Sequence, residues 1–262
     1  MRPNLLRQKL TAGEPTLSTH IHSVWPSVVE AIGHTGLYDY VEFVAEYGPS
    51  DLHDLDNLCR AAELYNMGSM CKIDQSLMPY LAQRAIGAGF GSVLFTDVRD
   101  VEEVRDCVRA ARPDHPEYGG HYGVATRRNS YMGYGGSPEY VESIGETVLA
   151  FMIEKKGAVD SLEEILEEPG VEMTQWGGSD FSVNIGHPRE MNHPEVVAAK
   201  KKVFETSLKM GVPTRAEIQT ADEAKEYLDM GVRHFSVGTD ITILHSFWRR
   251  EGEAITKALQ GG

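Results

Sequence analysis

The sequence predicts an α/β fold, a single (β/α)8 TIM barrel domain that spans residues 1–262. The chain has the length of one such barrel. Short β-rich runs alternate with amphipathic helical stretches, which is typical of βα units around a parallel sheet. Eight strands can be counted, enough to close a barrel, at residues 16–22, 38–45, 68–73, 92–96, 148–154, 171–176, 212–218 and 234–237.

Helix signals stand between these strands. Asp51 precedes a run with apolar residues at three helically spaced positions, which predicts a helix with an acidic N-cap. The span 192–210 has Pro194 near its first turn and Gly211 after its end, and 222–230 fits the same pattern. The alternation of strands and helices along the chain therefore supports the barrel.

Composition excludes several classes of partner. The formal net charge of −14 argues against nucleic acid or an anionic membrane surface, although a small anion can still bind locally. No apolar stretch approaches the roughly 20 residues needed to span a bilayer. The first residues lack the apolar core of a secretory signal, so we expect a cytoplasmic protein.

Polar residues at the strand ends are the first candidates for function. In a parallel barrel the active site lies at the carboxyl edge of the strands. The residues expected there are His22, Glu46, Tyr47, Lys72, Thr96, Asp97, Glu154, Asp180, Arg215, Glu217 and Asp240.

Two other groups of possible metal ligands lack the spacing of a site. Cys59, Cys71 and Cys107 show no CxxC pattern and are interpreted as buried thiols. His187 and His193 are six residues apart, without the i, i+4 spacing of a helical metal site, and are interpreted as loop histidines.

Four short motifs carry a resemblance to a known family. Phe-Met-Ile-Glu closes a strand at residues 151–154, and Trp-Gly-Gly-Ser-Asp-Phe-Ser follows the next strand at 176–182. His-Pro-Glu-Val opens a helix at 193–196, and Val-Gly-Thr-Asp stands at 237–240. With these motifs the sequence resembles the HpcH/HpaI aldolase family, also called the citrate lyase beta-like family, in register over nearly the whole chain. The resemblance implies a TIM barrel and a homo-oligomer, a hexamer in the family.

The resemblance also implies a divalent metal site. In the family a strand-end glutamate and the aspartate of a Gly-Pro-x-Asp-Leu-Ser motif bind Mg, Mn or Co, and the matching residues here are Glu154 and Asp180. The enolate of pyruvate or a related oxo-acid chelates the same ion. The chemistry agrees, because hard divalent ions prefer carboxylate oxygen and two carboxylates leave positions for substrate and water. The alternative is that both carboxylates pair with Lys155, Lys156 or Arg128.

Three further residues are expected to orient the substrate. Gly178 and Ser179 belong to the segment that replaces the family's Gly-Pro-Ala-Asp, and this strand-to-helix turn could offer backbone N–H groups to a carboxylate. Arg128 matches an arginine of the family's Arg-x-Ser-Arg loop, which helps to shape the substrate entrance. An ordinary turn and an exposed arginine are the plainer interpretations.

Several positions depart from the family pattern. Val44 and Tyr47 stand where the family has the aspartate and histidine of its proton-transferring dyad. Lys72 replaces an arginine that clamps the oxo-acid, and Met152 replaces a glutamine. Glu217 adds a charge at the end of the seventh strand. The base has therefore been relocated, the reaction has changed, or catalysis has been lost.

The candidates for a relocated base are His22, Tyr47 and Glu217, in that order, although a metal-bound hydroxide needs no side-chain base. Each also has a structural interpretation: His22 as a hydrogen-bonded core residue, Tyr47 as a packing residue, and Glu217 as an ion-pair partner of Arg215 or Lys72. Lys72 is expected to assist the developing enolate. A Schiff-base lysine with a lowered pKa is the alternative.

The sequence thus predicts a divalent-metal-dependent carbon–carbon lyase of the class II aldolase type. Its substrate is expected to be a small 2-oxo acid such as a pyruvate or oxaloacetate derivative. Two alternatives remain open: the same scaffold with a changed reaction, namely a decarboxylase, isomerase or hydratase, or a barrel that binds a ligand without catalysis.

Overall fold

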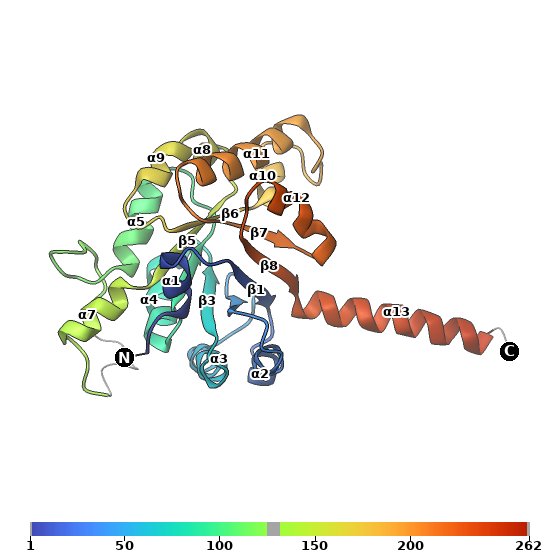
Figure 1. Ribbon diagram of the computed structural model, residues 1–262, viewed down its shortest axis with the longest axis horizontal. Helices are drawn as coiled ribbons and strands as arrows, with labels where there is room; N and C mark the ends of the chain where they lie inside the picture. The colour runs from blue at the N-terminus through green and yellow to red at the C-terminus, as the bar shows by residue number, and fades with distance from the viewer. Residues whose placement is uncertain (1, 125–131, 261–262) are drawn as a thin grey trace.

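A computed structural model describes residues 2–124 and 132–260 of the chain. Eight parallel strands pair in sequence order and close into a barrel, with β1 beside β8 (Figure 1). The predicted (β/α)8 barrel is therefore confirmed. The strands are β1 (Thr16–Ile21), β2 (Tyr40–Val44), β3 (Gly68–Ile73), β4 (Ser92–Phe95), β5 (Val148–Ile153), β6 (Met173–Trp176), β7 (Thr214–Ile218) and β8 (His234–Thr239).

Helices follow the strands and cover the outside of the barrel (Figure 1). The helix predicted after Asp51 is present, and the Asp51 carboxylate accepts the amide N–H groups of His53 and Asp54. The span 192–210 is one helix that begins at Pro194, whereas 222–230 divides into a 3-10 turn and a short helix. These elements are α2 (Pro26–His34), α3 (Leu52–Leu64), α4 (Met78–Ala88), α5 (Val101–Ala111), α7 (Pro138–Gly145), α8 (Lys156–Asp160), α9 (Leu162–Glu167), α10 (Gly178–Asn184), α11 (Pro194–Lys209), η1 (Ala221–Glu223) and α12 (Ala224–Asp229).

Four strands end one residue earlier than the sequence predicts. His22, Ala45, Thr96 and Glu154 are the first residues after β1, β2, β4 and β5 rather than the last residues within them. This difference matters for function, because a residue just beyond a strand stands at the carboxyl mouth of the barrel, where such enzymes bind their substrates.

The opposite end of the barrel is closed by α1 (Leu5–Thr11). Asn4, its N-cap, donates from Nδ2 to the carbonyl oxygens of Gly91 and Glu146, which lie just before β4 and β5. Leu6 packs into the barrel with a group of inward apolar side chains. These are Tyr40, Met70, Leu94, Val148, Ala150, Met152 and Met173.

A layer of buried polar side chains lies in the same barrel interior. Arg215 on β7 is 1% exposed and forms an ion pair with Glu42 on β2, which is fully buried. The Arg215 guanidinium also donates to the Gln175 side chain, at 2.7 Å from Nε, and to the Tyr40 hydroxyl at 3.1 Å. Because a buried guanidinium requires a counter-charge and several acceptors, these contacts bind β2, β6 and β7 together across the barrel.

The last helix, α13 (Asp240–Gln260), leaves the barrel after β8 and projects away from it (Figure 1). Asp240 is its one buried residue. Large apolar side chains are exposed along the helix, among them Ile243, Phe247 and Trp248. Among the described residues, no helix is both long and apolar enough to cross a membrane.

Candidate active site

Most of the predicted site residues meet at the carboxyl ends of the strands. Lys72 on β3 lies within electrostatic range of Glu154 after β5, and it also affects the pKa of His22 and of Tyr47. Glu217 on β7 is in turn within range of both His22 and Tyr47. Residues from strands on several sides of the barrel therefore share one electrostatic environment.

Glu154 is held in a fixed orientation at the end of β5. It is 2% exposed, and its Oε1 accepts the backbone N–H of Asp97 at 2.9 Å. Asp97 presents this amide from a left-handed conformation, with φ 60°. A Cβ at Gly177 would lie 2.1 Å from Glu154 Oε2, so a glycine is required at this position of the Gly-Gly-Ser-Asp segment.

Asp180 lies in the first turn of α10 with its carboxylate largely exposed. Lys155 Nζ lies between two carboxylates, 3.3 Å from Asp180 Oδ1 and 2.6 Å from Asp97 Oδ1. The alternative in which Lys155, Lys156 or Arg128 pairs with both carboxylates is therefore met for Asp180, whereas among the described residues neither lysine pairs with Glu154. Lys156, the other lysine considered, pairs with Asp160 instead.

The environment of Glu154 is suited to a cation. Within residues 2–124 and 132–260, no lysine, arginine or histidine nitrogen forms a salt bridge with its carboxylate. Burial, together with the nearby charges of Asp180 and Asp97, raises the pKa of Glu154 to about 7, although the Asp97 N–H bond and the charge of Lys72 lower it. Buried carboxylates of this kind are stabilised by an ion pair or by metal coordination, and oxygen ligands suit Mg²⁺ and Mn²⁺.

Lys72 points into the mouth as a charged ammonium. Its Nζ lies 2.7 Å from Glu46 Oε2 and 5.8 Å from the centre of the Tyr47 ring. Burial by itself would lower the pKa of Lys72, but Glu46, followed by Glu42 and Glu154, raises it above its ordinary value. The Schiff-base alternative required a lowered pKa and is therefore wrong on this point.

His22 lies against Tyr47, edge to face, with ring centres 5.2 Å apart. Burial lowers the pKa of His22, and the neighbouring cations of His20 and Lys72 lower it further against the pull of Asp240. The Asp240 carboxylate accepts the N–H groups of His22 and Ser23 at 2.9 and 3.0 Å. His22 is thus a neutral imidazole at pH 7 on a fixed backbone.

A buried histidine that the sequence reading missed connects the mouth to the interior. His20 Nε2 lies 3.0 Å from Glu42 Oε1, and its Nδ1 lies 3.4 Å from Glu217 Oε1. Both are ion-pair distances, although the angle at Glu42 is not that of a linear hydrogen bond. Burial acts to lower the pKa of His20, but the two carboxylates outweigh it and raise that pKa to about 9.

Glu217 is held ionised by this contact. Burial would raise the pKa of Glu217, but the His20 imidazolium lowers it. The Gln175 side chain donates to the other Glu217 oxygen at 3.2 Å. Of the two ion-pair partners expected for Glu217, Arg215 pairs instead with Glu42 and Lys72 pairs instead with Glu46.

One sequence signal could have revealed the interior network. His20 and Glu42 are each the one ionic side chain of their strand, and Arg215 shares β7 with Glu217, whereas strands buried on both faces are normally apolar. His20 and Glu42 are also direct partners in the β1–β2 ladder, which follows once the register is known. The pairing was hidden because the sequence does not state which strand residues point inward.

The predicted substrate-orienting residues fall in two places. Gly178 and Ser179 form the start of α10, where no N-cap side chain accepts the first N–H groups of the helix. Arg128 lies outside the described residues.

Comparison with known proteins identifies relatives over almost the entire chain. The sequence model of the family described as HpcH/HpaI aldolase/citrate lyase matches residues 20–246. The 5-keto-4-deoxy-D-glucarate aldolase of Klebsiella pneumoniae is 25% identical over 97% of this chain and 98% of its own length. A family protein from Burkholderia cenocepacia has the same fold, with a TM-score of 0.86, 25% identity and coverage of 97% and 100% of the two chains.

A more distant structure shares the fold with a bound ligand. The citrate lyase beta subunit of M. tuberculosis, complexed with oxaloacetate and magnesium, superimposes with a TM-score of 0.59. It is 11% identical, and the match covers 88% of this chain and 93% of that one. At this identity the likeness concerns the fold.

The His20 ion pairs should make stability depend on pH in the alkaline range. The pKa of His20 is about 9 in the folded chain, above the ordinary 6.5. Its contribution to the free energy of unfolding is therefore complete below pH 6.5 and is lost as the pH rises through about 9. Urea unfolding at pH 6.5 and pH 9.5 should show a loss on the order of a few kcal/mol in the native chain.

The variant His20→Gln supplies the control for this measurement. It should be less stable than the native chain at pH 6.5 and should lose little more by pH 9.5. Equal pH slopes for the two proteins would show that His20 is not charged in the folded state.

Proposed function

The chain belongs to the HpcH/HpaI aldolase/citrate lyase family, and from this premise we propose that it is a divalent-metal-dependent carbon–carbon lyase acting on a small 2-oxo acid. The observation that carries the proposal is Glu154, a buried carboxylate without a salt-bridge partner in the described chain, beside Asp180 at the barrel mouth. The keto-acid aldolase relative and the magnesium-containing lyase structure support the same reaction class.

Glu154 and Asp180 are the proposed metal ligands, with Mg²⁺, Mn²⁺ or Co²⁺ as the ion. When bound, the ion supplies a Lewis acid that stabilises the enolate of the oxo-acid. An ion at this site would compete with Lys155 for Asp180, and Lys155 would keep Asp97 as its second partner. Asp97, Glu154 and Asp180 outnumber the two nearby lysines, Lys155 and Lys72, which favours uptake of a cation.

Lys72 has the proposed role of stabilising the enolate oxygen electrostatically. Its ammonium is fixed by Glu46 and remains positive at any physiological pH, because its pKa is raised. Gly178 and Ser179 are proposed to hold the substrate carboxylate through the uncapped N–H groups of α10. Arg128 keeps its proposed place at the substrate entrance by resemblance alone.

His22 is the proposed proton-transferring base. Its ring lies against Tyr47, the position at which the resemblance places the family's histidine, so an imidazole enters the same region from β1 instead of β2. A neutral imidazole can accept the proton of the hydroxyl group as the carbon–carbon bond breaks. Glu217 is ionised, but its lowered pKa makes its carboxylate a weak base. The raised pKa of Tyr47 keeps its hydroxyl protonated at neutral pH, so it has no free site for a proton. His22 is therefore the better base of the three at neutral pH.

A homo-oligomer is the proposed assembly, with α13 as a contact between copies. The helix carries Ile243, Phe247 and Trp248 on a surface that projects away from the barrel of its own chain. Exposed apolar side chains gathered on one element mark an interaction surface. A second copy satisfies this surface by symmetry, as closed homo-oligomers do.

The metal ligands can be tested with Glu154→Gln and Asp180→Asn. Both variants should lower kcat/KM for cleavage of an aldol substrate to pyruvate and an aldehyde by roughly 100-fold or more with Mg²⁺ or Mn²⁺ present. EDTA should abolish native activity, and added Mn²⁺ should restore it. Glu253→Gln, on the exposed part of α13, is the matched control and should retain native rates.

Turnover that persists in EDTA would contradict the metal-dependent mechanism. A lack of turnover with every oxo-acid, despite measured Mn²⁺ binding, would favour the non-catalytic barrel. Release of CO₂ or a product of unchanged mass, followed by mass spectrometry, would identify a changed reaction.

The base can be tested with His22→Gln. This variant should lower kcat by roughly 100-fold to 10,000-fold. In the native enzyme the rate should decrease below pH 6.5 as His22 becomes protonated, and the variant should lose this acidic limb of the pH–rate profile. Tyr47→Phe keeps the ring against His22 and should cost far less. If Glu217→Gln removes that limb while His22→Gln keeps it, the base is Glu217.

The assembly can be tested with Trp248→Glu. Light scattering after gel filtration should give a multiple of the 29.0 kDa chain mass for the native protein and a smaller species for the variant. Glu251→Gln, three residues away on the same helix, should leave the mass unchanged. A native protein that elutes as a monomer would exclude the proposed contact.

A further inference from the structure

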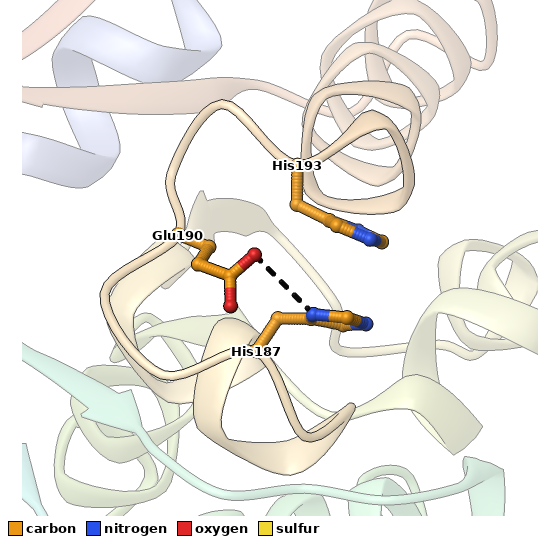
Figure 2. A group of neighbouring side chains, drawn as sticks. All are labelled: His187, Glu190 and His193. Carbon is orange, nitrogen blue, oxygen red and sulfur yellow. Dashed lines mark ion pairs between the residues drawn. The ribbon is translucent and has the colours of Figure 1, made fainter.

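Three potential metal ligands meet in the loop between α10 and α11, apart from the residues assigned to the active site. They are His187, Glu190 and His193, which we call the loop site. One ligand atom from each residue lies within 4.8 Å of the others. Figure 2 shows the two imidazole rings lying one above the other, with the Glu190 carboxylate pointing toward His187.

The backbone of the loop explains why these residues meet. The Glu190 N–H donates to the His187 carbonyl at 3.0 Å, and the His193 N–H donates to the Glu190 carbonyl at 2.9 Å. Two successive turns that share Glu190 therefore bring positions 187, 190 and 193 together. Each histidine precedes a proline, which restricts its backbone to extended conformations and limits the freedom lost on ligand binding.

The two imidazole rings are close together but must reorient to share one ion. The ring centres of His187 and His193 are 3.6 Å apart with an interplanar angle of 18°. A coordinated imidazole points its nitrogen lone pair at the ion in the plane of its ring, so one of the stacked rings must turn until both nitrogens lie about 2.0–2.1 Å from Zn²⁺. Glu190 Oε2 lies 3.5 Å from His187 Nδ1, and His193 Nδ1 accepts the Glu195 N–H at 3.4 Å, a long contact that is readily exchanged.

We propose that the loop site binds a transition-metal ion of the Zn²⁺ class. Two imidazoles and one carboxylate suit Zn²⁺, Co²⁺ and Ni²⁺, whereas Mg²⁺ and Ca²⁺ prefer oxygen ligands alone. All three side chains are exposed or half-buried, so the ion enters from solvent and keeps a water as its fourth ligand. The interpretation of His187 and His193 as unrelated loop histidines rested on helical spacing, which a pair of turns does not require.

Occupancy of the loop site should stabilise a segment that touches the substrate end of the barrel. Met191 lies within the loop, and its Cε would lie 2.6 Å from a Cβ placed on Gly178, the first residue of α10. The His187 and Arg189 N–H groups bond to Ser182 of the same helix, at 2.8 and 3.3 Å. An ion that fixes the loop therefore also restricts the helix that carries Asp180.

The test is Zn²⁺ titration of the untagged full-length protein by calorimetry, with Mg²⁺ in large excess to occupy carboxylate sites. The native chain should bind one more Zn²⁺ per chain than the double variant His187→Ala/His193→Ala. Co²⁺ should give the visible absorption of a nitrogen-liganded tetrahedral ion in the native chain but not in the variant. Hydrogen exchange of residues 185–193 should slow when Zn²⁺ is added.

Controls separate this site from the proposed active site. His53→Ala, which removes another exposed histidine, should bind Zn²⁺ like the native chain. Asp180→Asn should also retain the loop-site ion, so failure of the proposed function leaves this measurement unaffected. Equal Zn²⁺ stoichiometry in the native chain and the double variant, with both folded by circular dichroism, would overturn the proposal.

Discussion

The ion pair between Arg215 and Glu42 is the constraint on which the barrel interior depends. Both side chains are withdrawn from water, so each would be strongly unfavourable alone, and together they join strands on opposite parts of the barrel. Apolar side chains of similar volume would stabilise the barrel interior equally well. The charges in this one therefore serve the mouth above them, where His20 shares Glu42 with Arg215.

His20 couples this buried ion pair electrostatically to the residues at the mouth of the barrel. Glu42 helps to keep His20 protonated, and His20 keeps Glu217 ionised. His20 and Lys72 in turn lower the pKa of His22, which favours the neutral imidazole that the proposed base requires. Under the proposed function, a rearranged set of charges takes the place of the dyad that the resemblance leads us to expect at Val44 and Tyr47.

The two proposed cation sites differ in their donor atoms, and this difference makes them chemically independent. Glu154 and Asp180 offer only oxygen, which suits a hard ion with exchangeable water, whereas His187 and His193 offer nitrogen. The two sites are nevertheless connected through the backbone, because α10 carries Asp180 and the loop that follows α10 carries the histidines.

The sequence by itself determined the barrel and the placement of Glu154, Lys72 and Asp180 near its carboxyl mouth, because periodicity and position after a strand are local properties. It also located the helix after Asp51, since a cap is formed within one turn. Tertiary structure alone decided that His20 faces Glu42, that Lys155 pairs with Asp180 and that two turns join His187 to His193. These contacts depend on strand register, side-chain direction and loop geometry, which arise only when distant segments pack together.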